Sequence, residues 1–278
     1  MTGVVSENQA YFGKIASEYD QRNADAVVQL ERYINERIPF IGIKQGARLL
    51  DYACGTGMLS RVLAQHTSEA IGIDLTQDMV DVYNTQAQSH VSIAQCQTRR
   101  RPIGTSRQAY QGNLADPADA SPAAFADAKF FDFDVAGVGL GFHHFDKPGL
   151  ASKRLAERLK TGGVLFIIDF VAHKIDPEDA AHRGITHHGF VEDEIKQMFE
   201  NAGLTDFGYQ ELPEPIAFKD PRGEKQHGHG HGHGHGHSQN HANSHDHDKH
   251  SHGHGHGHGE NKGLSMIKRV FIARATKL

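Results

Sequence analysis

The stretch LLDYACGTGMLS, residues 49–60, decides the fold. An apolar run ends in Asp51, and the small residues Ala53, Gly55 and Gly57 then occupy alternate positions before a helical pattern. Small residues let the backbone turn tightly and let a ligand approach the main chain. The helix that follows would present unpaired N–H groups at the same place. The stretch therefore predicts a strand, a ligand-binding turn and a helix of a parallel sheet.

A second acid, Asp74, closes the next apolar strand. A carboxylate there can accept both hydroxyls of a ribose, as the second-strand acid does in nucleotide-binding sheets. A dinucleotide fingerprint would need G-x-G-x-x-G, with the pyrophosphate on the helix end. Here the series is D-x-A-x-G-x-G, and its acid would repel a diphosphate but favour the sulfonium and ammonium of S-adenosylmethionine. We favour that cofactor over the alternative, an NAD(P)-dependent oxidoreductase.

The remaining sequence alternates short apolar runs with amphipathic segments, which is typical of repeated βαβ units. Strands are predicted at 47–52, 70–74, 108–114, 133–138, 164–170, 207–211 and 266–273, and helices at 7–38, 58–66, 78–87, 150–159 and 191–202. The predicted fold is α/β and Rossmann-like: a seven-stranded, mostly parallel sheet with an antiparallel last strand and helices on both faces. We expect one domain over residues 1–278.

Charge and cysteine content narrow the class of protein. With 29 Lys+Arg against 34 Asp+Glu, the formal net charge is −5, so no nucleic-acid partner is expected. Cys54 and Cys96 give no disulfide framework and fit a reducing compartment. The start of the chain shows no signal-peptide pattern, and no apolar run is long enough to span a bilayer. These features predict a soluble, cytoplasmic protein.

Residues 213–264 form a histidine-rich insert that holds fourteen of the 22 histidines. Alternating Gly-His repeats have great backbone freedom and nothing apolar to bury, so disorder is expected. Imidazoles bind Ni²⁺, Cu²⁺ and Zn²⁺. The candidate ligands, outside the active site, are His227, His229, His231, His233, His235, His237, His252, His254, His256 and His258. Metal binding by a protein with an enzyme scaffold is thus an alternative function. The simpler interpretation of the insert is a surface insertion that the fold tolerates.

Residues 49–60, together with IGIDLTQDM at 71–79, resemble the first two cofactor motifs of class I methyltransferases. The likeness is closest to the branch that contains ubiquinone/menaquinone-biosynthesis enzymes and many small-molecule methyltransferases. YFGKIASEYD (11–20) resembles the N-terminal cofactor lid, which we place in helices 7–38, and GNL (112–114) resembles the adenine motif. The resemblance implies methyl transfer to a small-molecule acceptor.

Carried over by position, the resemblance implies a set of cofactor contacts. Asp51 would act near the methionine amino end, Asp74 would hold the ribose, and Asn113 would accept from the adenine amino group. Asn113 stands where many members have Asp, and its amide oxygen can still accept that hydrogen bond. The full implied set is Tyr19, Asp51, Ala53, Cys54, Gly55, Gly57, Asp74, Leu75, Met79, Asn113, Leu114 and Val138.

Two adjacent histidines, His143 and His144, follow the fourth predicted strand. Ligands of open α/β sheets bind outside the carboxyl ends of the strands, so the pair is well placed for catalysis. We favour His144 as the residue that points inward, and a structural hydrogen bond to a neighbouring loop is the alternative. A general base is needed only if the accepting atom arrives protonated. His187, His188 and His173 are weaker candidates, and no active-site metal is expected.

Overall fold

The computed structural model describes residues 3–97, 106–175, 178, 180, 183–219 and 265–278. The chain divides into two compact units, Met1–Phe218 with Ile267–Leu278, and Lys219–Met266. Of the second unit, the structure describes only Lys219, Ser265 and Met266. A single domain over residues 1–278 therefore stays a prediction.

Seven strands form one sheet in the order β3-β2-β1-β4-β5-β9-β6. The strands from β3 to β5 pair in parallel, and β9 runs antiparallel between β5 and β6. The strands are β1 Ala47–Tyr52, β2 Thr67–Asp74, β3 Ser106–Gln111, β4 Phe133–Gly139, β5 Leu159–Phe170, β6 Leu204–Glu211 and β9 Val270–Lys277. This arrangement confirms the predicted fold class.

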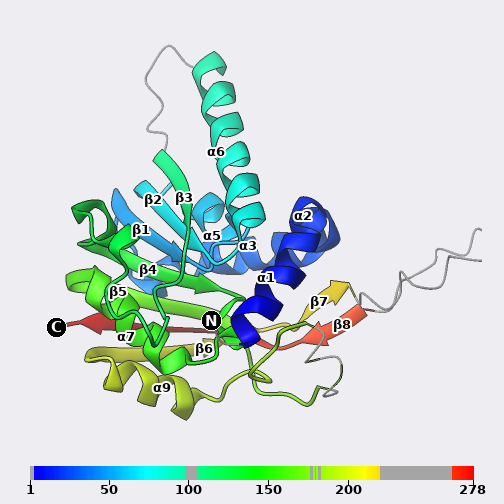
Figure 1. The fold of residues 1–278 in the computed structure, drawn as a ribbon, viewed down its shortest axis with the longest axis vertical. Coiled ribbons are helices and arrows are strands. Elements are labelled where there is room, and N and C mark those ends of the chain that lie inside the picture. Colours follow the sequence, from blue (N-terminus) through cyan, green and yellow to red (C-terminus); the bar gives the residue numbers. More distant parts are fainter. Residues whose placement is uncertain (1–2, 98–105, 176–177, 179, 181–182, 220–264) are drawn as a thin grey trace, which may run out of the picture. The chain divides into compact units, whose positions relative to one another are not determined.

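Helices flank this sheet (Figure 1). They are α1 Gly3–Ile15, α2 Tyr19–Arg22, α3 Ala24–Glu36, α4 Ile38–Ile41, α5 Met58–Val62, α6 Gln77–Gln97, α7 Pro148–Arg158 and α9 Glu192–Asn201, with the short 3-10 turns η1 Ala16–Glu18 and η4 Phe142–His144 near the candidate site. α5 contacts β1 and β4 and α6 contacts β2 and β3, whereas α7 contacts β4 and β5 and packs against α9. The sheet order proceeds in opposite directions from β1 and β4, so right-handed crossovers place α5 and α7 on opposite faces.

Close packing at the centre of the sheet depends on glycine. A Cβ atom on Gly137 of β4 would lie 2.5 Å from the ring of Phe166, a fully buried residue of β5. On β2, a Cβ atom on Gly72 would lie 2.8 Å from Sγ of Cys54. These strands read as continuous apolar runs because both faces of a parallel sheet are covered by helices.

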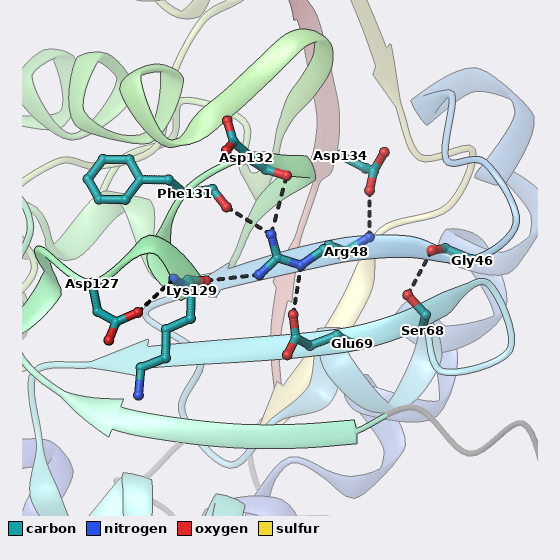
Figure 2. Close-up of polar contacts among 9 residues, drawn as sticks. All are labelled: Gly46, Arg48, Ser68, Glu69, Asp127, Lys129, Phe131, Asp132 and Asp134. Carbon is teal, nitrogen blue, oxygen red and sulfur yellow. Dashed lines mark hydrogen bonds and ion pairs between the residues drawn. The ribbon is translucent and has the colours of Figure 1, made fainter.

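At the amino end of β1, Arg48 ties the sheet to the segment that precedes β4 (Figure 2). Its guanidinium donates to Glu69 Oε2 at 2.7 Å and to the carbonyl oxygens of Phe131 and Lys129, each at 2.9 Å. The backbone N–H of Arg48 donates to Asp134 Oδ2 at 2.8 Å. These contacts hold the end of the sheet opposite to the candidate site.

Several details differ from the sequence-based expectations. The predicted last strand, 266–273, is divided between β8 (Ser265–Lys268) and β9, and the predicted helix 78–87 continues to Gln97. The predicted helix 7–38 is broken into α1, η1, α2, α3 and the start of α4. The predicted insert 213–264 begins too early, because Ile216–Lys219 forms strand β7, which pairs with β8 (Ser265–Lys268) in a second sheet. Ile216 and Phe218 are buried, so this stretch has apolar side chains to bury and need not be irregular. The expected disorder of the His-rich residues lies outside the described residues.

No helix among the described residues has both the length and the apolar character needed to cross a membrane.

Candidate active site

The glycine turn after β1 is built from residues in the left-handed region. Ala53 has φ 54°, Gly55 has φ 51° and Gly57 has φ 93°. A Cβ atom on Gly57 would lie 2.7 Å from the ring of Tyr83, whereas one on Gly55 would meet nothing within 4 Å. Left-handed backbone is costly for Ala53, and such strain is concentrated at functional sites. The turn is thus tightly packed at Gly57, whereas the space next to Gly55 is open.

Asp51 lies at the end of β1 and is buried. Its Oδ2 accepts from the Ser60 N–H at 3.1 Å and from the Ser60 hydroxyl at 2.7 Å, and that hydroxyl accepts from Tyr83 Oη at 2.7 Å. The Asp51 carboxylate therefore already accepts a hydrogen bond from a backbone amide in the first turn of α5. Burial raises the pKa of the Asp51 carboxyl to about 7, and the nearby Asp74 adds to the rise while the Ser60 bonds oppose it.

Asp74 closes β2 beside the same turn and is 8% exposed. One carboxylate oxygen accepts from Gly55 N–H and the other from Thr76 N–H, each at 2.9 Å. Burial raises the pKa of Asp74 as well, against these hydrogen bonds. The Thr76 side chain and the Leu75 backbone also donate to this carboxylate, which lies beside the open Gly55.

This arrangement fits S-adenosylmethionine and not a dinucleotide. Two buried carboxyls, Asp51 and Asp74, flank the turn and influence each other's charge. A pyrophosphate would meet this negative charge, and Asp51 already takes an α5 amide of the kind that holds phosphates at helix ends. A cationic nucleoside would instead relieve the cost of burying these acids.

The N-terminal residues 3–22, called the lid below, contact this site. Gln9 Nε2 donates to the carbonyl oxygen of Leu75 at 3.2 Å, and a Cβ atom on Gly13 would lie 2.7 Å from Asp78 Oδ2. Tyr19 is half-buried, and burial, with the charge of Asp74 among the lesser causes, raises its pKa to about 12. The lid thus contacts the segment that follows Asp74, and its role as a cofactor lid stays a prediction.

The predicted adenine-side residues are less open than expected. Asn113 Oδ1 already accepts from Tyr52 Oη at 3.0 Å and from Ala115 N–H at 2.9 Å, so it has no lone pair left for an adenine amino group. The Leu114 N–H donates to Tyr52 Oη at 3.2 Å. Met79 and Val138 are buried in the core. Among these residues, only Leu75 presents a half-buried side chain beside Asp74.

His143 and His144 lie in the 3-10 turn η4 after β4 and differ in their surroundings. His143 is buried, and its Nδ1 lies 2.7 Å from Oδ1 of Asp169, which is fully buried in β5. His144 is half-buried, and its Nδ1 donates to the carbonyl oxygen of Gly184 at 3.0 Å. Since a carbonyl only accepts, the proton of neutral His144 sits on Nδ1, and Nε2 keeps a lone pair. Burial, followed by the neighbouring His143, holds the pKa of His144 well below its ordinary value.

The His pair and the glycine turn are neighbours. A Cβ atom on Gly141, just before the pair, would lie 2.9 Å from the Cβ of Ala53. Leu140 also has a positive φ, 56°, so strained residues end both β1 and β4. The topology therefore places a half-buried imidazole beside the predicted cofactor turn.

The other candidate residues take structural positions. His187 stacks on Phe190, and the Nδ1 of His173 donates to the carbonyl oxygen of Val171 at 3.0 Å. Cys54 is buried, and burial raises the pKa of its thiol well above its ordinary value, so the thiol is unreactive. Within the described ranges no three His, Cys, Asp or Glu side chains form a metal site. The ten candidate metal-binding histidines of the insert lie outside those ranges.

The sequence did not point to three residues that make contacts around the candidate site: Asn8, Asp20 and Asp169. Asn8 Nδ2 donates to the carbonyl oxygen of His144 at 3.0 Å, across 136 residues of sequence. Asp169 carried a usable signal, because an acid inside an apolar strand must find partners, and it accepts from two backbone N–H groups as well as from His143. Asn8 carried a similar signal, because it is a polar residue at helical spacing from Val4, Tyr11 and Ile15 and is buried in the structure. Asp20 carried no such signal.

A family model described as a methyltransferase domain matches residues 26–207. The chain is 31% identical over 170 residues to a methyltransferase of Schizosaccharomyces pombe, which covers 58% of this chain and 55% of that protein. It is 28% identical over 164 residues to the demethylmenaquinone methyltransferase of Clavibacter sepedonicus, which covers 58% and 57%. The chain thus spans little more than half the length of these curated relatives.

Solved structures agree on the fold. The YcgJ protein of Bacillus subtilis superposes with a TM-score of 0.54 at 18% identity, covering 86% of this chain and 95% of that one. A Bacillus halodurans protein superposes with a TM-score of 0.53 at 15% identity, covering 87% and 97%. At such low identity, these superpositions speak for the fold alone.

Proposed function

This chain belongs to the methyltransferase domain family, and on that premise we propose that it transfers a methyl group from S-adenosylmethionine to a small-molecule acceptor. The observation that carries the proposal is the pair of buried carboxyls, Asp51 and Asp74, on either side of the open Gly55. When bound, the cofactor supplies a methyl group on an already activated leaving group. The chain then has to align the acceptor and exclude water.

We assign the cofactor contacts to residues around the glycine turn. Asp74 would hold the ribose hydroxyls from its place beside Gly55, with Gly55 and Gly57 supplying the surface of the turn. Asp51 would act electrostatically, because its Oδ2 is held by Ser60. Tyr19 and the rest of the lid would cover the cofactor from the other side.

Aromatic rings run from the lid to the end of β5 and support a planar acceptor. Phe12 meets His144 edge-on with centroids 4.9 Å apart, and the His144 and His143 rings are 4.1 Å apart. His143 in turn lies 4.9 Å from the ring of Phe170. Such rings favour an aromatic partner by stacking or edge contacts. The name of the demethylmenaquinone methyltransferase relative agrees with a ring-bearing acceptor.

His144 is assigned as the proton acceptor where the acceptor's nucleophile carries a proton. Gly184 fixes the proton on Nδ1, so Nε2 is the basic atom. Its lowered pKa keeps the imidazole neutral, and thus competent to accept a proton, throughout the neutral range. His143 is held by Asp169 and supports the turn from which His144 projects.

Equilibrium dialysis with S-adenosylhomocysteine and with NAD(P) tests the proposal. We expect binding of the first and none of the second, and weaker binding in Asp74→Asn. Tight NAD(P) binding without S-adenosylhomocysteine binding would replace the proposal with the oxidoreductase alternative. Incubation with methyl-labelled cofactor and cell extract, followed by identification of the labelled product, would identify the acceptor.

Deletion of residues 226–259 tests the metal-binding alternative. We expect methyl transfer to be retained, because none of the assigned residues lies in that segment. Loss of biological activity on deletion, together with unchanged cofactor affinity in Asp74→Asn, would instead favour metal binding as the function. A cytoplasmic location is part of the same proposal, and fractionation of cells checks it.

A further inference from the structure

Asp20 of α2 connects the lid directly to the glycine turn. Its Oδ1 accepts from the hydroxyl of Thr56 at 2.5 Å, and Thr56 stands between the two glycines of the turn. Its Oδ2 accepts from Gln86 Nε2 of α6 at 2.8 Å. One carboxylate on the lid is therefore bound to both the turn and the helix beside it.

Arg61 contacts Asp20, Thr56 and Gln86. Its Nη1 donates to the carbonyl oxygen of Thr56 and to Gln86 Oε1, each at 2.8 Å, and lies 3.7 Å from Asp20 Oδ2. The side chain of Asp20 is 35% exposed and that of Arg61 is 18% exposed. The Asp20 carboxylate thus faces the Arg61 cation and two donors, Thr56 and Gln86, which Arg61 also contacts. These contacts fix the position of the Asp20 side chain.

From these contacts we propose that Asp20 is the latch of the lid: its hydrogen bonds to Thr56 and Gln86 hold residues 3–22 closed over the glycine turn and set how fast the nucleoside leaves. The proposal rests on the proposed function, because the turn is where the cofactor would lie. Tyr19 precedes Asp20 and lies near Asp74, so opening the latch also removes the lid from the ribose end of the site. Asp20 is a positioning residue and does not take part in methyl transfer.

The lid has a second set of contacts, made by α1. Asn8 donates to the His144 carbonyl and Gln9 to the Leu75 carbonyl, both from α1. Because Asp20 is the charged member of these contacts, and charge-assisted hydrogen bonds are about twice as strong as neutral ones, its loss should matter most.

The rate of release of labelled S-adenosylhomocysteine from the full chain measures the latch. Thr56→Val should speed release by about tenfold, the effect of losing one charge-assisted hydrogen bond, and Asp20→Ala, which removes two, should speed release by at least as much. The double variant should be no faster than the faster single one, since both changes break the same contact. Glu7→Gln, which removes an exposed acid of α1, and Thr56→Ser, which keeps the hydroxyl, should release at the rate of the unmodified chain.

Hydrogen exchange in the ligand-free protein gives a second readout. Asp20→Ala should speed amide exchange in residues 3–22 relative to Glu7→Gln, with exchange in β4 and β5 unchanged. Release and exchange that are both unaffected by Asp20→Ala and Thr56→Val would overturn the latch while leaving the proposed function intact. If the unmodified chain bound no S-adenosylhomocysteine, the proposed function would fail, and the exchange experiment alone would still decide whether Asp20 holds the lid.

Discussion

Asn8 and Gly184 are so close that a Cβ atom on Gly184 would lie 1.9 Å from Oδ1 of Asn8. Gly184 also has φ 61°, a backbone region that other residues rarely adopt. Its carbonyl oxygen accepts from His144 Nδ1, and Asn8 Nδ2 donates to the His144 carbonyl. Lid, proposed base and the 183–190 loop therefore meet at one glycine.

Gly184→Ala should destabilise the fold by about 1–3 kcal/mol from the positive φ alone, with a further cost from the clash with Asn8. Thermal or urea unfolding measures this. In an Asn8→Ala background the clash is gone, so the same change should cost less, and a double-mutant cycle isolates the difference. Gly3→Ala is the control, because a Cβ atom there meets nothing within 4 Å. Equal costs in both backgrounds would contradict the contact.

His144→Asn separates the two nitrogens of the imidazole. The Asn amide can keep a donor near Gly184 O, but it has no acceptor in the place of Nε2. We expect kcat for a protonated acceptor to fall by about 10²–10⁴-fold, the usual contribution of a general base, with little change in cofactor affinity. Kinetics with the identified acceptor would measure it.

The pH profile of the unmodified enzyme is a separate test of His144. A base whose pKa lies below 6.5 is already unprotonated at pH 6.5 and above, so kcat should stay level down to about that pH. A profile that falls with a midpoint above pH 7 would speak against His144 as the base.

Asp51→Asn should change the pH dependence of stability. The folded pKa of Asp51, about 7, lies above its ordinary value of 3.8, so between these values the folded state holds a proton that the unfolded chain has released. The contribution of Asp51 to stability must therefore fall as pH rises from 4 to 7 and level off above 7. The variant lacks this loss.

Melting temperatures of both chains from pH 4 to 8 provide the measurement, with Asp25→Asn, an exposed acid of α3, as control. As pH rises from 4 to 7, the melting temperature of Asp51→Asn should rise relative to that of the unmodified chain. The melting temperature of Asp25→Asn should differ from that of the unmodified chain by a constant amount. Parallel curves for Asp51→Asn would show that its carboxyl is not held protonated by burial.

Arg48→Ala should lower the free energy of unfolding by about 1–2 kcal/mol, because it leaves Glu69 and three carbonyl oxygens without their donor. The estimate is modest since the Arg48 side chain is 30% exposed. Arg48→Lys should recover only part of the loss, because an ammonium lacks the planar fork that reaches four acceptors. Urea unfolding checks this against Lys153→Ala, an exposed control, and S-adenosylhomocysteine affinity at low temperature should be unchanged.

Local sequence was enough for the fold and for the core of the candidate site. The run ending in Asp51 predicted β1 over the range the structure shows, and the D-x-A-x-G-x-G series predicted a turn whose alternate residues are left-handed. Asp74 was placed at the end of β2 for the same reason. Strand periodicity, turn residues and the carboxyl-end rule depend on neighbours in the chain, so they can be read without coordinates.

Tertiary structure alone decided which polar atoms remain available. Asn113 was expected to face adenine, yet its oxygen is taken by Tyr52, 61 residues away in sequence. Asp20 meets Thr56 across 36 residues, and His143 meets Asp169 across 26. A hydrogen bond of this kind depends on where two elements are brought together by the sheet order, and helical or strand periodicity contains no information on that. The sequence by itself thus determined the sheet and its carboxylates, and the packing determined the latch, the tautomer of His144 and the glycine at 184.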